Sequence, residues 1–288
     1  TVAAITTLIM FLIKWNIVLN NEVKKRTKEL RESNKQLSLS NQEIAQANEE
    51  LKVHDKMQKE FINVANHEIK TPIQAILTFS QLLQRYPERQ KEFTPAINRN
   101  SLRLQRLSND ILDVAKIESH SLNLNKEIFD LNQVISNIIE DHKSIIGKEN
   151  YKVKLLFYPS KESLSVKADK ERIVGVISNL LSNAIKFTKD GEIIVSTEMN
   201  EDNNNNFHAL VTVKDTGDGI DPAILPKIFS KFITKSFDGL GLGLYISKNI
   251  VEVHGGKIWA ENNIKNGKSG AVFNFTLPLC NNNKSSYN

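Results

Sequence analysis

The segment around His67 carries a side chain that could act as a nucleophile. In a helix with about 100° between residues, His67 lies roughly 160° around from Ile69, away from the apolar stripe that includes Ile69. A core histidine is therefore the weaker interpretation. Glu68 could hydrogen-bond the Nδ1 proton of the ring and leave Nε2 free to attack. Thr71 shares the face of His67, and Pro72 lacks the N–H that would bond the Glu68 carbonyl, which allows a kink there.

A second set of polar side chains recurs at helical spacing. Asn179, Asn183 and Lys186 stand at i, i+4 and i+7, so a helix places them on one face, while Ile173 and Ile177 occupy another. Amide oxygens and an ammonium group on one face could hold Mg²⁺ and phosphate oxygens. The alternative is an ordinary exposed polar face.

A third motif follows a predicted strand and contains Asp215, Gly217 and Gly219. A carboxylate at a strand end can accept a hydrogen bond from the amine of adenine, and glycines let the backbone approach a ligand closely. The alternative is a simple hairpin turn, since Asp-Gly is a common turn dipeptide.

A fourth motif, Gly239, Gly241 and Gly243, leads directly into a predicted helix. Glycines at a helix start expose backbone N–H groups to phosphates, and the spacing differs from the dinucleotide-binding fingerprint. Phe229 and Phe232 precede these glycines and could anchor a mobile lid over a nucleotide; core packing is the alternative, and both can hold.

The order of these motifs resembles the H, N, G1, F and G2 boxes of sensor histidine kinases, over roughly residues 55–280. The resemblance implies that His67 is the phosphoacceptor, Glu68 the base and Thr71 a residue that orients water during dephosphorylation of a partner. It also implies that Asn179 and Asn183 hold Mg²⁺. The remaining implied contacts with ATP come from Lys186, Phe187, Asp215, Gly217, Gly219, Phe229, Phe232, Gly239, Gly241 and Gly243.

The sequence departs from the family pattern in two places. Ile69 and Lys70 stand where Leu and Arg are usual, and the lid, residues 221–238, is short. ATP binding is still expected, whereas the behaviour of the lid is left open.

The N-terminal third of the chain is organised as helices. Residues 2–13 are nearly all apolar, and Trp15 and the basic cluster at residues 24–26 are typical of the inner end of a membrane span. The alternatives are a buried or interfacial helix and a signal-peptide remnant. Because no methionine precedes Thr1, we expect a further segment upstream.

A heptad repeat follows the basic cluster. Its apolar positions recur every seven residues, and asparagines recur with the same period: Val23, Leu30, Leu37, Ile44 and Leu51, with Asn34, Asn41 and Asn48. Asparagine at such positions favours a parallel two-stranded coiled coil, and a solvated single helix is the alternative. Two further amphipathic helices, separated by a turn at residues 86–89, predict a hairpin that forms a four-helix bundle in a homodimer.

Helix and strand patterns alternate after residue 126. They predict helices at 128–139 and 168–186 and after Gly241, and strands at 152–158, 192–197, 209–213, 257–261 and 271–277. The expected fold class is multidomain: an all-α coiled coil and dimeric hairpin, then an α+β two-layer sandwich of the GHKL ATPase type. The expected segments are residues 1–19 (membrane-span remnant), 20–54 (coiled coil), 55–122 (dimerisation and phosphotransfer), 127–280 (ATP binding) and 281–288 (disordered tail).

Composition agrees with a folded signalling protein. The 288 residues are 40% hydrophobic, and the net charge of +5 is too mild to require a nucleic-acid partner. Cys280 is the single cysteine, which fits a reducing compartment. We expect a homodimer at the cell membrane, cytoplasmic from about residue 20, that uses Mg²⁺ and ATP to phosphorylate itself and then a response-regulator receiver domain. It is also a candidate phosphatase of that partner. The alternatives are an ATP-binding scaffold with weak kinase activity and a GHKL conformational ATPase.

Overall fold

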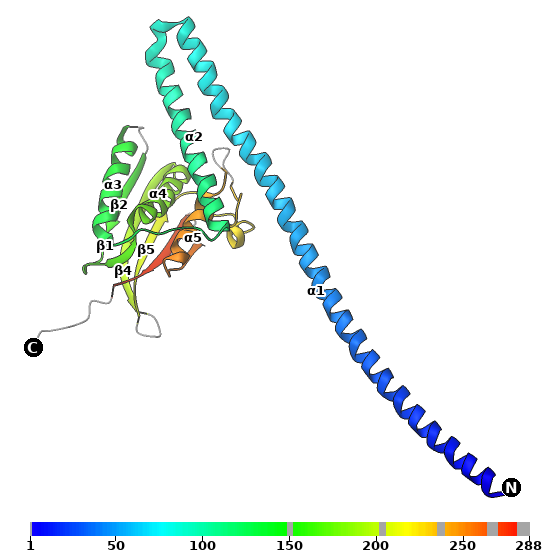
Figure 1. Ribbon diagram of the computed structural model, residues 1–288. Coiled ribbons are helices and arrows are strands. Elements are labelled where there is room, and N and C mark those ends of the chain that lie inside the picture. The colour runs from blue at the N-terminus through cyan, green and yellow to red at the C-terminus, as the bar shows by residue number, and fades with distance from the viewer. Residues whose placement is uncertain (1, 149–151, 202–205, 235–239, 264–269, 281–288) are drawn as a thin grey trace, which may run out of the picture. The chain divides into compact units, whose positions relative to one another are not determined.

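The computed structural model describes residues 2–148, 152–201, 206–234, 240–263 and 270–280 (Figure 1). The chain divides into two compact units, residues 1–64 and 65–288. The predicted disordered tail, residues 281–288, lies outside the described residues, as does Gly239.

The described residues of the first unit, 2–64, all lie in one helix, α1 (Val2–Arg85). The apolar heptad side chains from Val23 to Leu51 are all exposed in this single chain. Among the residues that the structure describes, no helix holds an apolar stretch long enough to cross a membrane. The coiled coil and the membrane attachment therefore stay predictions.

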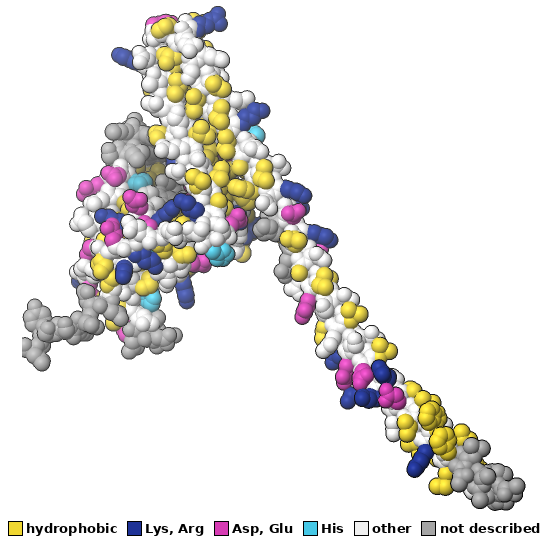
Figure 2. Space-filling model, viewed as in Figure 1, with side chains coloured by type: hydrophobic (Ala, Val, Ile, Leu, Met, Phe, Trp, Pro, Cys, Tyr) yellow, Lys and Arg dark blue, Asp and Glu magenta, His cyan; other side chains and the backbone are white. Residues whose placement is uncertain are grey.

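The second unit begins with a helical hairpin. It consists of the last part of α1, a 3₁₀ turn (Pro87–Arg89) and α2 (Gln90–Glu118), which confirms the predicted pair of helices and the turn between them. Phe79 and Phe93 pack across the hairpin with their ring centroids 6.0 Å apart. Apolar side chains also remain exposed along the hairpin (Figure 2): Ile73, Leu77, Leu102 and Leu112. Such an uncovered stripe is the surface that a second hairpin would bury.

The rest of the second unit is an α/β domain with one five-stranded sheet, in the order β2-β4-β5-β7-β6. The strands β2 and β4 are parallel, and the other neighbours are antiparallel. The strands are β2 (Lys152–Tyr158), β4 (Asp190–Glu201), β5 (Phe207–Asp215), β6 (Ile258–Asn262) and β7 (Ala271–Pro278); the helices are α3 (Leu131–Lys148), α4 (Lys170–Phe187) and α5 (Gly243–Val253).

Alternating side chains of the sheet form the core of this domain. On β5, Ala209, Val211 and Val213 are fully buried, while the residues between them are half-buried. The helix α4 packs against β5 and lies between α3 and α5, with Ile173 and Ile177 buried. This is a helical layer on a sheet, so the predicted two-layer sandwich is confirmed, together with all five predicted strands.

Two helix predictions were wrong at their N-terminal ends. Residues 128–130 and 168–169 belong to strands, β1 (Lys126–Asp130) and β3 (Ser165–Asp169), which form a separate antiparallel pair. Each strand ends on an aspartate whose carboxylate accepts a backbone N–H at the start of the next helix. Asp130 accepts from Gln133, and Asp169 accepts from Arg172. These are N-cap contacts, and they start α3 and α4 two to three residues later than expected.

Candidate functional site

His67 lies on an exposed face of α1. Its side chain is 80% exposed, which confirms that it points to water. One turn later, the hydroxyl of Thr71 donates a hydrogen bond of 3.2 Å to the His67 carbonyl. The helix continues through Pro72 to Arg85, so the proline does not end it. The imidazole is accessible to an incoming phosphoryl group.

Glu68 contacts a residue that the sequence did not point to. Its Oε2 accepts a hydrogen bond of 2.9 Å from Nη2 of Arg103 on α2, whereas its Oε1 lies 3.8 Å from Nδ1 of His67. The expected direct bond between Glu68 and His67 is therefore not made here, because the carboxylate is directed towards the guanidinium. Arg103 is 35 residues away in sequence, and the only signal was its place beside Leu104 on the apolar stripe of α2.

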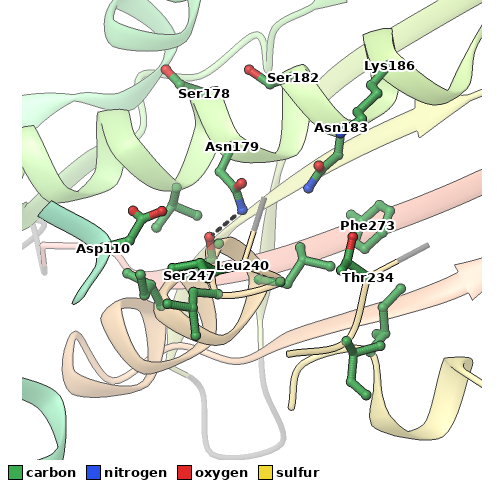
Figure 3. Close-up of a pocket in the computed structure, with 18 of the residues that line it drawn as sticks. Asp110, Ser178, Asn179, Ser182, Asn183, Lys186, Thr234, Leu240, Ser247 and Phe273 are labelled. Atoms are coloured by element: carbon green, nitrogen blue, oxygen red, sulfur yellow. Dashed lines mark hydrogen bonds between the residues drawn. The ribbon is translucent and has the colours of Figure 1, made fainter. Parts of the chain in front are cut away.

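A cleft of about 1650 Å³ gathers most of the other predicted residues (Figure 3). Side chains and backbone of α2, α4, α5 and the end of β5 line it. The predicted residues among them are Asn179, Asn183, Lys186, Phe187, Asp215, Gly219, Gly241 and Gly243. Segments more than 60 residues apart in sequence thus form one site.

Asp215 ends β5 and is only 3% exposed. Its Oδ1 accepts hydrogen bonds from the N–H groups of Gly217 (2.9 Å) and Ala271 (3.1 Å). Burial raises the pKa of this carboxyl and Asp218 adds to the rise, while the two backbone hydrogen bonds oppose it. Because Oδ1 already takes two hydrogens, Oδ2 is the oxygen that can accept from a ligand amine.

Two glycines of the motifs allow close contact between segments. A Cβ at Gly217 would lie 2.3 Å from the Phe187 carbonyl oxygen, and one at Gly243 would lie 2.4 Å from Oδ1 of Asn179. No side chain fits at either distance, so the glycines let the Asp215 loop and the start of α5 pack against α4.

Asn179 and Asn183 project from one side of α4, and Ser178 and Ser182 project from the other side (Figure 3). Nδ2 of Asn179 donates a hydrogen bond of 3.0 Å to the hydroxyl of Ser247 on α5. Within the described ranges, no cluster of three or more His, Cys, Asp or Glu side chains is suited to a metal. The two amide oxygens nevertheless fit Mg²⁺, which is bound in nucleotide sites by few protein ligands together with phosphates and water.

The two lid phenylalanines differ in their surroundings. The ring of Phe229 packs edge-on against Phe273 of β7, with centroids 6.4 Å apart. Phe232 has a positive φ of 66°, and its N–H donates to the Gly241 carbonyl over 3.1 Å. Phe229 thus anchors this segment to the sheet, as the core-packing alternative expected, while Phe232 joins it to the glycine motif through backbone.

Asp110 on α2 also lines the cleft, and sequence reasoning missed it. Burial raises the pKa of its carboxyl to about 6; Asp113 adds to this rise and Arg106 opposes it. Next to it, Asp113 pairs with Arg172 of α4 over 2.5 Å. The charge pattern of α2 alone resembles an ordinary solvated helix face, so only the burial of Asp110 in the folded domain, where α2 packs against α5, makes this residue unusual.

Comparisons with known proteins agree with this geometry. The His Kinase A (phospho-acceptor) domain matches residues 57–120, and the histidine kinase-, DNA gyrase B- and HSP90-like ATPase domain matches residues 168–281. Together they match more than half of the chain, in the order of the motifs. The chain belongs to the sensor histidine kinase family.

Individual relatives match about three quarters of this sensor histidine kinase chain. Hybrid signal transduction histidine kinase B of Dictyostelium discoideum is 31% identical over 76% of the chain, which spans 11% of that protein's length. The solved histidine kinase ThkA, in complex with the response regulator TrrA, is 32% identical, with a TM-score of 0.54. The match covers 75% of the present chain and 60% of the ThkA chain. ShkA in complex with AMPPNP is 23% identical, with a TM-score of 0.58 over 77% of the chain and 46% of its own, and shares the fold.

Proposed function

We propose that this chain is an ATP-dependent protein-histidine kinase that phosphorylates His67 and passes the phosphoryl group to an aspartate of a response regulator. One observation carries the proposal: an exposed histidine on a HisKA hairpin and a preformed nucleotide cleft with a buried aspartate occur in the same chain. A conformational ATPase of the same nucleotide fold would need the cleft but not the histidine.

The reaction at His67 is an in-line displacement. Nε2 attacks the γ-phosphorus of ATP, an N–P bond forms, the bond to the bridging oxygen breaks, and ADP leaves. Glu68 stabilises the imidazole as it becomes cationic. Because Glu68 is held by Arg103 at 2.9 Å, its carboxylate must turn towards Nδ1, 3.8 Å away, before it acts. The N–P bond is labile, which suits transfer to an acidic side chain.

The nucleotide is held by the cleft. Asp215 accepts from the adenine amine through Oδ2, and Lys186 and the backbone at Gly241 and Gly243 meet the phosphates. Asn179 and Asn183 would hold Mg²⁺, which when bound neutralises charge on the phosphates. Asn179 is oriented by Ser247, and this bond leaves its Oδ1 to act as the ligand atom.

Dimerisation, the coiled coil and membrane attachment complete the proposal. The exposed apolar residues of the hairpin are the surface that a second copy would cover, and the heptads of residues 20–54 would continue the dimer. The apolar residues 2–13 and the basic cluster at 24–26 support attachment of this end to a cell membrane, with the remainder cytoplasmic. The partner aspartate belongs to a receiver domain, towards which the chain would also act as a phosphatase through Thr71.

Phosphorylation with γ-labelled ATP and Mg²⁺ tests the kinase activity directly. The 288-residue chain should incorporate label that is acid-labile and alkali-stable, and His67→Gln should abolish it without changing ADP affinity. His208→Gln is the matched control, because His208 lies on β5 outside the cleft lining. Label that persists in His67→Gln would contradict the assignment. ATP binding without any label would favour the scaffold, and ATP hydrolysis without label would favour the ATPase.

A further inference from the structure

Asn262, the last residue of β6, makes a two-point contact that none of the motifs includes. Its Nδ2 donates to the Ile220 carbonyl over 2.6 Å, and its Oδ1 accepts from the Ile220 N–H over 2.7 Å. The side-chain amide thus satisfies both backbone groups of one residue that is 42 positions away in sequence. Two bonds to a planar amide set orientation as well as position.

Ile220 stands at a junction in the nucleotide site. It follows the Asp215 loop and precedes Asp221, the first residue of the lid, and both Ile220 and Asp221 line the cleft. Gly219, directly before it, has a φ of 72°. The backbone of Ile220 therefore forms the end of the Asp215 loop in the wall of the cleft.

One residue pair in the β6 and β7 ladder contacts both ends of the loop from Asp215 to Ile220. Asn262 is the register partner of Ala271 in the β6 and β7 pair. The Ala271 N–H bonds Oδ1 of Asp215 over 3.1 Å at one end of the loop, and the Asn262 amide bonds Ile220 at the other. The backbone of Gly270, next to Ala271, also lies close to Asp215. A Cβ at Gly270 would lie 2.2 Å from the Asp215 carbonyl oxygen.

We propose that Asn262 is a positioning residue of the nucleotide site: it fixes the Ile220 backbone, so that the loop from Asp215 to Ile220 keeps the shape that binds the nucleotide. This inference rests on the proposed binding of ATP. Asn262 itself lines the cleft, but Ile220 occupies both ends of its amide, so Asn262 acts through the Ile220 backbone and not by contact with a reacting atom. A strand-end contact with a purely structural role would change stability without a specific effect on nucleotide binding.

The substitution Asn262→Asp separates the two roles. The carboxylate keeps the acceptor for the Ile220 N–H but turns a donor into an acceptor that faces the Ile220 carbonyl. We expect affinity for ADP, measured by calorimetry on the full chain at pH 7.5, to fall about tenfold, as for a partly buried carbonyl that loses its donor and faces a carboxylate instead.

Asn263→Asp is the matched control, because it adds the same charge one position later, outside the cleft lining, and we expect it to bind ADP as wild type does. Wild-type affinity for ADP in Asn262→Asp, even with a lowered unfolding temperature, would show a purely structural role and overturn the proposal. If the wild type itself binds no ADP, the proposed function fails instead. Should Asn262→Asp not fold, amide hydrogen exchange of Ile220 in the wild type decides: slow exchange without nucleotide supports the fixed junction, and fast exchange contradicts it.

Discussion

The helix that carries His67 and the cleft that contains Asp215 differ in how far their key side chains are exposed to water. The His67 side chain is 80% exposed and projects from a continuous helix, while Asp215 is 3% exposed and is held by backbone N–H groups from two segments. In the proposed reaction, exposure would let the histidine meet two successive partners, a nucleotide and a receiver domain. Burial lets the aspartate read one ligand in one geometry, with its hydrogen bonds in place before binding.

This difference implies that substitutions in the cleft and substitutions near His67 affect different measured quantities. The cleft is preorganised, so changes there should alter affinity. The histidine needs Oε1 of Glu68 to move closer to Nδ1, so changes there should alter the rate. A single substitution that changes both the nucleotide affinity and the phosphorylation rate would contradict this distinction.

The largest expected effect is that of Glu68→Gln on the rate of phosphorylation. Without a carboxylate to stabilise the imidazolium, we expect the initial rate of label incorporation to fall about 10²-fold to 10³-fold, within the range for general acid–base groups. ADP affinity, measured by calorimetry, should not change. Glu92→Gln is the control, because Glu92 pairs with Arg89 at the far end of the hairpin and is exposed. A normal rate in Glu68→Gln would remove Glu68 from the mechanism.

Asp215→Asn should have the second largest effect, and on binding. The amide would place either its neutral oxygen or its NH₂ group against the N–H donors of Gly217 and Ala271, so we expect ADP affinity to fall about 10-fold to 100-fold.

The wild type should show a matching pH dependence at Asp215. Burial raises the pKa of Asp215 above its usual 3.8, and in the proposed site the charged form would be the acceptor for adenine. Affinity should therefore fall as the pH drops through that raised pKa, and calorimetry across the acid range should find Asp215→Asn flatter than wild type. Equal pH profiles would show that Asp215 does not titrate in the site.

Asp110→Asn should have the smallest effect, on stability. Its pKa is raised from 3.8 to about 6, so the folded state keeps a proton that the unfolded state releases, and stability is lost as the pH rises through that window. The neutral amide avoids this cost. We expect thermal unfolding at pH 8 to shift upward by about 2–4 °C, the size of a modest change in a domain of this length, and to match wild type below about pH 4. Asp141→Asn, on an exposed position of α3, should show no such pH-dependent shift.

Much of the site was visible in local sequence. The helical spacing of Asn179 and Asn183 and the position of Asp215 at a strand end are properties of short segments, and the structure brings all three into one cleft. The exposure of His67 also followed from the helical period alone. Five strands and the hairpin were predicted for the same reason, because their periodicities of 2 and 3.6 are written into consecutive residues.

The contacts that only the tertiary structure decided join residues far apart in the chain. Arg103 takes the Glu68 carboxylate across 35 positions, Asn262 holds Ile220 across 42, and β1 pairs with β3 across about 40. A short pattern states which face a residue occupies but not which distant group will lie opposite. Sequence by itself therefore determined the reacting groups and most of the secondary structure, whereas the fold determined their partners and, through burial, the raised pKa values of Asp110 and Asp215.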